Sequence, residues 1–457
     1  MRWFTVFLMM LPAFALAQTG RFQSGGVPNV GAPEEALIPS LAAKQDRLEE
    51  LGWMIRGQAT FILQGQAGFR SPYRAEGSLT PAAQARNTLS TDLILGRRLW
   101  HGAEIIVNPS VTRGFGLSNS TGVASFPNGE AFRLGSSEPV LFFPRIFFRQ
   151  TIGLSSDMAP ADNDPLRFTE PMPRERITLT IGKISVWDIF DDNRYAHDPR
   201  TQFMSWALVG GGGFDYAADA RGFTEGVALE WENGSWAVRG GAFRVARQAN
   251  GLFLDPSITR GFQGIASLER FWRIGDREGA VRFIYGYSRA RQSRWNELFT
   301  NGFNTFNINP NGYRAKHNYT ISFDQQVTED FGVFARVSGN DGRTQNWMFT
   351  EMDRALSFGG ALTGQRWGRA SDTVGLGTNI GWISGGRRRF LEAGGIGFIT
   401  GDGRLNYRPE WITETYYDAR VAPGIHAALG YALIVNPAYN ADRGPVSIFS
   451  LRMRAAF

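Results

Sequence analysis

The chain ends with the stretch VSIFSLRMRAAF, which runs from Val446 to Phe457. Phe449, Leu451 and Met453 occupy one phase of this stretch, and Arg452 and Arg454 occupy the other. A period of two that ends in an aromatic residue is typical of a membrane β-strand with one face toward lipid and one toward a lumen. We expect this strand to close a barrel that begins near Trp53.

The composition agrees with alternating strands. The chain has 55 Gly, 35 Phe, 13 Trp and 12 Tyr residues, yet its mean hydropathy is only −0.23. It has no cysteine, so no disulfide framework holds it together. The 48 basic and 42 acidic residues are scattered without a Lys/Arg block, which argues against nucleic acid as a partner.

The N-terminus has the features of an export signal. Arg2 precedes an apolar stretch at residues 3–14, and Ala15-Leu16-Ala17 has the small residues of a cleavage site. We predict a signal peptide over residues 1–17 and a periplasmic leader over residues 18–52, with a short helix within 34–51. Residues 53–457 are then the barrel domain, and no later stretch has the length of a transmembrane helix.

From Trp53 onward the period is two, in seventeen runs. The runs lie at residues 53–69, 89–99, 103–112, 144–154, 174–186, 222–231, 235–247, 261–273, 279–289, 315–327, 331–340, 352–362, 372–383, 387–400, 409–420, 423–435 and 446–457. Single-chain bacterial barrels have an even number of strands, with short inner turns and long outer loops.

The lengths of the connections indicate which of the seventeen runs is not a membrane strand. Counting from both ends with each end in the periplasm, the two counts conflict only between residues 341 and 371. We therefore predict an all-β, antiparallel transmembrane barrel of sixteen strands, in which 352–362 is loop and 387–400 is strand. Ser384-Gly385-Gly386 is then an inner turn, and the inner connection at 155–173 is longer than this scheme explains.

A barrel of sixteen strands encloses an aqueous channel, because side chains alone cannot fill it. The polar phase should face this lumen, since an arginine facing mid-bilayer lipid costs about 2–4 kcal/mol. We predict that five arginines belong to the lumen wall: Arg149, Arg176, Arg239, Arg282 and Arg452.

The third outer connection, residues 186–221, is the richest in aromatic and charged residues. Folded into the lumen, it would narrow the channel and offer charged groups to the hydroxyls of sugars; otherwise it is an ordinary surface loop. Its glycine run at 210–213 suggests a hinge. The predicted constriction residues are Trp187, Asp188, Asp191, Asp192, Arg194, Tyr195, His197, Asp198, Arg200, Asp215 and Arg221.

Two other functions of this connection are less favoured. The spacing of Asp188, Asp191, Asp192 and Asp198 is not that of a calcium loop. His197-Asp198 could belong to a hydrolase, but no serine lies in a nucleophile motif. We expect no metal site, no cofactor and no catalytic residue.

Four stretches resemble the carbohydrate-selective porins of Gram-negative outer membranes, the OprB-type family. They are FRSPY at 69–73, GVASFPNGE at 122–130, the block at 181–221 with DPRTQF at 198–203, and NPAYNADRGPV at 436–446. The likeness runs from about Gly57 to Phe457. The Trp-Gly-Gly-x-Arg entry that many members have before the first strand is replaced by LGWMIR at 51–56.

The resemblance implies a sixteen-stranded barrel in the bacterial outer membrane that admits sugars by facilitated diffusion. Arginines and acidic residues would lie at its constriction. A general or organic-acid-selective porin is the alternative, and a barrel enzyme is a third possibility. The expected partners are sugars and outer-membrane lipid, with no nucleic acid, and the chain is expected to be a monomer or a trimer.

Overall fold

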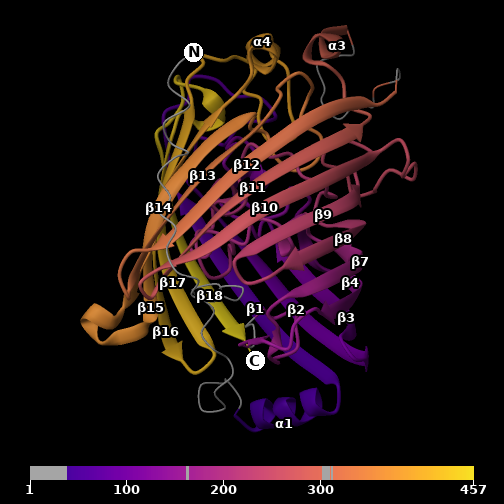
Figure 1. Ribbon diagram of the computed structural model, residues 1–457. Helices are drawn as coiled ribbons and strands as arrows, with labels where there is room; N and C mark the ends of the chain where they lie inside the picture. The colour runs from indigo at the N-terminus through magenta and orange to yellow at the C-terminus, as the bar shows by residue number, and fades with distance from the viewer. Residues whose placement is uncertain (1–38, 161–163, 301–308, 310–311, 457) are drawn as a thin grey trace.

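The computed structural model describes residues 39–160, 164–300, 309 and 312–456, and the side chains from residue 44 onward. In these residues sixteen antiparallel strands form one closed barrel (Figure 1). The strands are β1 (Trp53–Gln66), β2 (Gln84–Trp100), β3 (Ala103–Gly114), β4 (Ser136–Gly153), β7 (Arg176–Ile184), β8 (Thr224–Glu232), β9 (Trp236–Arg244), β10 (Phe262–Ile274), β11 (Arg277–Ala290), β12 (Arg314–Gln326), β13 (Phe331–Asn340), β14 (Arg354–Gly364), β15 (Arg369–Trp382), β16 (Glu410–Ala422), β17 (Ile425–Val435) and β18 (Val446–Ala456). The predicted fold class and number of strands are confirmed. The predicted signal peptide lies outside the described residues.

The first and last strands close the barrel. Their register runs from Gln58 beside Ala456 to Gln66 beside Ile448. Phe449 and Met453 are exposed on the outer face of β18, whereas Arg452 and Arg454 are buried on the inner face. The period of two therefore separates a lipid-facing surface from a polar lumen, because successive side chains of a strand point to opposite faces.

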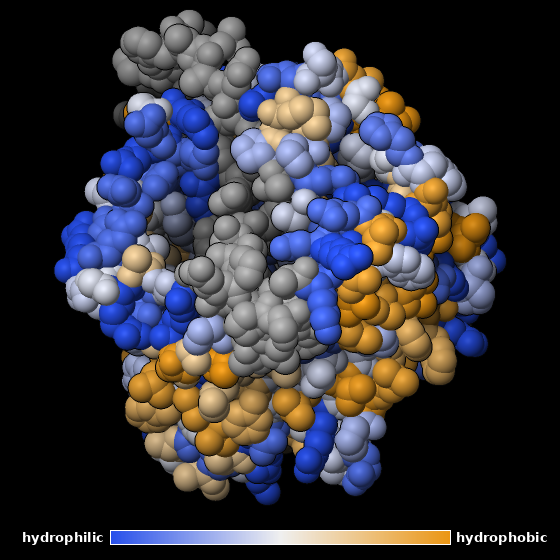
Figure 2. All heavy atoms as spheres, turned by 90° about the horizontal axis from the view of Figure 1, so that it is seen from below, coloured by the Kyte–Doolittle hydropathy of each residue, from blue (hydrophilic) through white to orange (hydrophobic). Residues whose placement is uncertain are grey.

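The two ends of the barrel differ. Helix α1 (Pro39–Glu50) lies at the end where β18 finishes, and α3 (Trp295–Thr300) and α4 (Gly385–Glu392) lie at the opposite end (Figure 1). Seen from the α1 end, hydrophobic side chains gather over parts of the outer rim (Figure 2). None of the helices within the described residues is long and apolar enough to span a membrane.

The prediction that 352–362 is loop and 387–400 is strand is wrong. Strand β14 covers most of the first stretch and pairs along its length with both β13 and β15, with Leu356 between Val337 and Ile380. The second stretch begins as α4 and continues as loop. Ser384 Oγ accepts a hydrogen bond from Arg387 N and so caps this helix.

The packing of α4 explains why the stretch at 387–400 begins as a helix and not as a strand. Phe390 and Leu391 are buried in one apolar cluster with Trp295 and Leu298 of α3. Such a cluster needs both residues on one side of a helix, and a strand would place them on opposite faces. Consequently Ser384-Gly385-Gly386 is not an inner turn but lies in an outer loop. The turn between β14 and β15 is instead made by η4 (Gln365–Trp367).

The long inner connection also has a structural explanation. It contains a small two-stranded sheet, β5 (Met158–Ala159) with β6 (Met172–Pro173). Leu166 and Phe168 are buried, and Arg149 Nη1 donates to Leu166 O at 3.0 Å. This connection therefore packs into the end of the barrel instead of making a simple turn.

Candidate functional site

Residues 185–223, here called the β7–β8 segment, cross the lumen. Arg200 Nη1 lies 2.5 Å from Asp92 Oδ2 of β2, and Asn193 Nδ2 donates to Ser322 Oγ of β12 at 3.1 Å. Strands β2 and β12 are eight places apart in the ring of sixteen. Since both partners face inward, one segment contacts opposite walls of the barrel.

Buried side chains of the wall hold this segment from several directions. Arg336 of β13 pairs with Asp191 at 2.7 Å and donates to Leu208 O and Ala196 O. Glu414 of β16 accepts from the backbone amides at 204 and 205, at 2.7 and 2.9 Å. Neither wall residue is among the predicted site residues. Their inward phase could be recognised in the sequence, but their partners could not.

The acidic members of the segment have different roles. Asp188 makes a two-point ion pair with Arg145 of β4, with an Nη2–Oδ1 distance of 2.6 Å, and accepts from Ser185 N. Asp191 is buried and forms an ion pair with Arg336. Asp192 and Asp198 remain partly exposed. The four predicted acidic residues therefore do not act as one cluster, because Asp188 and Asp191 pair with arginines of different strands.

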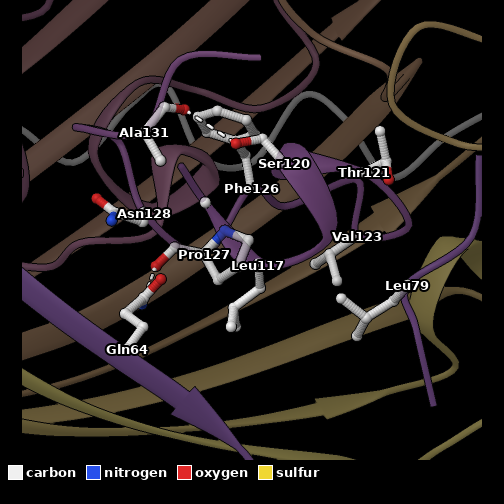
Figure 3. A pocket seen from close by; sticks show the side chains of 11 residues that line it. Gln64, Leu79, Leu117, Ser120, Thr121, Val123, Phe126, Pro127, Asn128 and Ala131 are labelled. Atoms are coloured by element: carbon white, nitrogen blue, oxygen red, sulfur yellow. Dashed lines mark hydrogen bonds between the residues drawn. The ribbon is translucent and has the colours of Figure 1, made fainter. Parts of the chain in front are cut away.

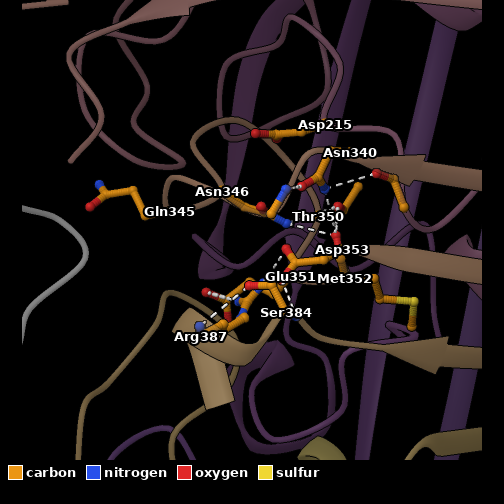
Figure 4. A network of polar contacts seen from close by, with 12 residues as sticks. Asp215, Asn340, Gln345, Asn346, Thr350, Glu351, Met352, Asp353, Ser384 and Arg387 are labelled. Carbon is orange, nitrogen blue, oxygen red and sulfur yellow. Dashed lines mark hydrogen bonds and ion pairs between the residues drawn. The ribbon is translucent and has the colours of Figure 1, made fainter. Parts of the chain in front are cut away.

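Asp215 connects the segment to an outer loop. It is fully buried, pairs with Lys316 Nζ at 3.2 Å, and accepts from the amides of Trp347, Met348 and Phe349. Figure 4 shows this carboxylate beside the network that continues to Glu351, which pairs with Arg387 of α4 at 2.8 Å. Buried carboxylates thus join the segment, the 341–353 loop and α4, because each accepts several donors.

The basic members bind acids of the wall and of the β3–β4 connection, or stack on rings. Arg194 Nη2 lies 2.5 Å from Glu278 Oε2, and Arg200 contacts both Asp92 and Glu130. Burial lowers the pKa of Arg200, but Glu130 and Asp92 outweigh this effect and raise it above its usual value. Arg221 lies over the ring of Phe142, 4.8 Å from its centroid.

Aromatic residues form the interior of the segment. Trp187 and Tyr216 lie 5.3 Å apart between ring centroids, and Trp206 contacts Phe349 of the outer loop at 4.9 Å. Burial raises the pKa of the Tyr216 hydroxyl well above its usual value. These rings belong to one apolar core inside the barrel, so Trp187 and Tyr216 pack against protein.

Close packing also explains two glycines. Tyr195 fits against Gly332, where an added Cβ would lie 1.9 Å from the tyrosine Cζ. Gly213 N donates to Ser338 Oγ at 2.9 Å, and a Cβ there would lie 2.7 Å from Ser338 O. The run at 210–213 is thus buried against the wall, and the expected hinge is replaced by close contact.

A second connection, residues 115–135, joins the β7–β8 segment within the lumen. Trp206 N donates to Phe126 O at 2.9 Å, and Gly129 N donates to Met204 O at 2.8 Å. Gln64 of β1 donates to Pro127 O and borders a small cavity beneath this connection (Figure 3). The residue pattern of this connection does not predict its place in the site, because backbone hydrogen bonds leave no pattern in the sequence.

The five predicted wall arginines all face inward and are buried. Each pairs with a carboxylate: Arg149 with Glu104, Arg176 with Glu232, Arg239 with Glu230 and Glu269, Arg282 with Asp324, and Arg452 with Asp418. The pairs from β7 to β12 connect neighbouring strands, because inward residues at matching register lie side by side.

His197 is held by contacts within the β7–β8 segment. Its Nδ1 lies 3.1 Å from Asp191 O, and its backbone amide donates to Gln202 Oε1. Within the described residues, no three His, Cys, Asp or Glu side chains are grouped to hold a metal ion.

A closed sixteen-stranded barrel with a lipid-facing exterior and polar segments across its lumen is the architecture of an outer-membrane porin. The model of the carbohydrate-selective porin, OprB family matches residues 76–457. The chain therefore belongs to this family, which is a family of channels, and it is a carbohydrate porin of the bacterial outer membrane. The expected family and localisation are confirmed.

Solved structures of one porin share the fold. The high-pH structure of Pseudomonas putida OprB matches with a TM-score of 0.70 and 16% identity, over 93% of this chain and 99% of that one. The low-pH structure of the same porin matches with a TM-score of 0.50 and 13% identity, over 95% and 100%. The DcaP channel of Acinetobacter baumannii matches with a TM-score of 0.48 and 8% identity, over 89% and 98%. No curated protein sequence gives a match.

Proposed function

We propose that carbohydrates diffuse passively through a passage bounded by the β7–β8 segment and the lumen wall. The observation that supports this proposal is that the segment has two kinds of residue, buried ones that hold it in place and partly exposed ones that can contact a solute. Trp187, Asp191, Asp215, Arg194 and Tyr195 are buried and hold it in place. The partly exposed charged or polar members can meet a solute: Asp188, Asp192, His197, Asp198, Arg200 and Arg221.

A neutral solute suits this passage better than an organic acid. The five predicted wall arginines are each paired with a carboxylate, so much of their charge is neutralised locally. Charged hydrogen-bonding groups of both signs can still exchange with the hydroxyls of a sugar, which donate and accept.

Liposome swelling with a panel of sugars tests this function. We expect monosaccharides to enter, and we expect glucose to block single-channel current more strongly than succinate. Block by succinate without block by glucose would favour the organic-acid porin instead.

The double substitution Arg194→Ala and Arg200→Ala tests the role of the segment. It removes tethers to Glu278, Asp92 and Glu130, so we expect higher conductance and weaker sugar block. Arg113→Ala removes one exposed charge outside the lumen and is the control. Unchanged conductance, ion selectivity and sugar block in the double variant would contradict a constriction at the segment.

We further infer that the channel needs neither catalysis nor a partner chain. One chain closes its own barrel, so each copy would conduct whether it is a monomer or part of a trimer. Light scattering of the purified protein distinguishes these two states. Loss of a lipid-hydrolysing activity on His197→Ala would contradict the inference that the chain is not an enzyme.

A further inference from the structure

Arg454 differs from the other inward arginine of β18. Arg452 donates to Pro199 O at 2.9 Å and Gln202 O at 2.7 Å, and pairs with Asp418 at 3.2 Å. Arg454 lies two residues further toward the α1 end on the same face, and its side chain is 8% exposed. Among the described residues its guanidinium has no hydrogen-bond or ion-pair partner, and its Nε is buried.

A second polar group beside Arg454 is also without a partner. Thr60 of β1 is the register partner of Arg454, and its side chain faces the same lumen. Thr60 is 2% exposed, and its buried Oγ1 has no hydrogen-bond partner among the described residues. A buried polar group without a partner loses its hydration without compensation, so a solute hydroxyl between these two groups would form hydrogen bonds that the protein itself does not supply.

The third group comes from the β7–β8 segment. Arg452 holds the turn at 198–202 above this part of the wall through Pro199 O and Gln202 O. Asp198 is partly exposed, and its carboxylate is one of the two that act most strongly on the charge of Arg454. Its oxygens accept from Arg200 N and Thr201 Oγ1, but each retains a further lone pair.

We propose that Arg454, Thr60 and Asp198 form a carbohydrate-binding subsite on the α1 side of the β7–β8 segment. Arg454 donates to one sugar hydroxyl, Asp198 accepts from another, and Thr60 Oγ1 does either. The carboxylate of Asp198 within the subsite favours a neutral polyol over an acid. This subsite rests on the proposed function, since it deepens the passage described above.

Glucose block of single-channel current in planar bilayers tests the subsite on the full-length channel. We expect Arg454→Ala to raise the half-blocking glucose concentration about tenfold, as for the loss of a hydrogen bond from a charged donor. Thr60→Val preserves shape and removes only the hydroxyl, so it should raise that concentration by a factor of about three. Arg113→Ala should leave it unchanged.

The outcomes separate the two proposals. If the wild type is blocked by glucose and both variants are blocked equally well, the subsite is wrong while the proposed function stands. If Arg113→Ala weakens block as much as Arg454→Ala, general charge explains the effect and the subsite is again wrong. If Arg454→Ala does not fold, Thr60→Val decides alone. Absence of sugar block and sugar entry in the wild type would overturn the proposed function itself.

Discussion

Two regions of the lumen wall use inward-facing arginines in opposite ways. From β7 to β12, inward arginines pair with carboxylates of neighbouring strands, and Arg239 lies among three glutamates. On β18, Arg452 binds mainly backbone carbonyls of the β7–β8 segment, and Arg454 binds no described residue. The same residue type on the same face therefore either joins neighbouring strands of the wall or, as we propose for Arg454, contacts solute. The residues that surround each arginine decide which of these two roles it has.

The largest effect is expected at the centre of the paired region. Arg239→Ala would remove the ion pairs that this arginine makes with the buried carboxylates of Glu230 and Glu269, which should lower the free energy of unfolding by about 3–5 kcal/mol. Urea unfolding of the reconstituted protein measures this change. Adding Glu269→Gln to Arg239→Ala should recover part of the loss, and a loss below about 1 kcal/mol would contradict the comparison.

A smaller loss is expected where a carboxylate connects the segment to the 341–353 loop. Asp215→Asn keeps the shape but weakens the bonds to Lys316 and to three amides, which should cost about 1.5–3 kcal/mol. Limited proteolysis should then cut the loop faster. Asp219 accepts hydrogen bonds from the backbone amides of Arg221 and Phe223 within the same segment, so Asp219→Asn should leave cleavage of this loop unchanged.

The two arginines of β18 should differ in their effect on stability. Arg452→Ala should lower the free energy of unfolding more than Arg454→Ala does. Arg452→Ala removes bonds to two carbonyls and to Asp418, so we expect a loss of about 1–3 kcal/mol and noisier open-channel current. Arg454→Ala removes no such bond and should cost less than about 1 kcal/mol. Equal losses in the two variants would mean that Arg454 is also a structural residue.

The smallest effect is expected outside the lumen. Arg366 pairs with Asp330 between two inner turns, and this hydrogen bond, with that of Thr328, lowers the pKa of Asp330 to about 2. The ionised form is favoured in the folded state, so this stabilisation is present above the ordinary pKa of 3.8 and is lost as the pH falls toward 2. Asp330→Asn should therefore differ from the wild type at pH 5 and converge with it near pH 2. A difference that grows on acidification would refute this assignment.

Much of the barrel could be predicted from local alternation. The period of two reports which face of a strand is apolar, so it identified the closing strand, the number of strands and the inward phase of all five wall arginines. It could not distinguish 352–362 from 387–400, because a short alternating run resembles a strand whether or not neighbours pair with it. Leu356 has partners on both sides, whereas Phe390 packs against Trp295 of a distant helix.

The sequence by itself determined a porin-like barrel with a polar lumen and a charged third outer connection. Only the tertiary structure decided which charges are paired and which have no partner among the described residues. Arg452 and Arg454 look equivalent in the chain, yet their environments depend on the turn at 198–202 and on β1, which are hundreds of residues away. The energy of a buried charge depends on partners within a few ångströms, and the closure of the barrel places those partners.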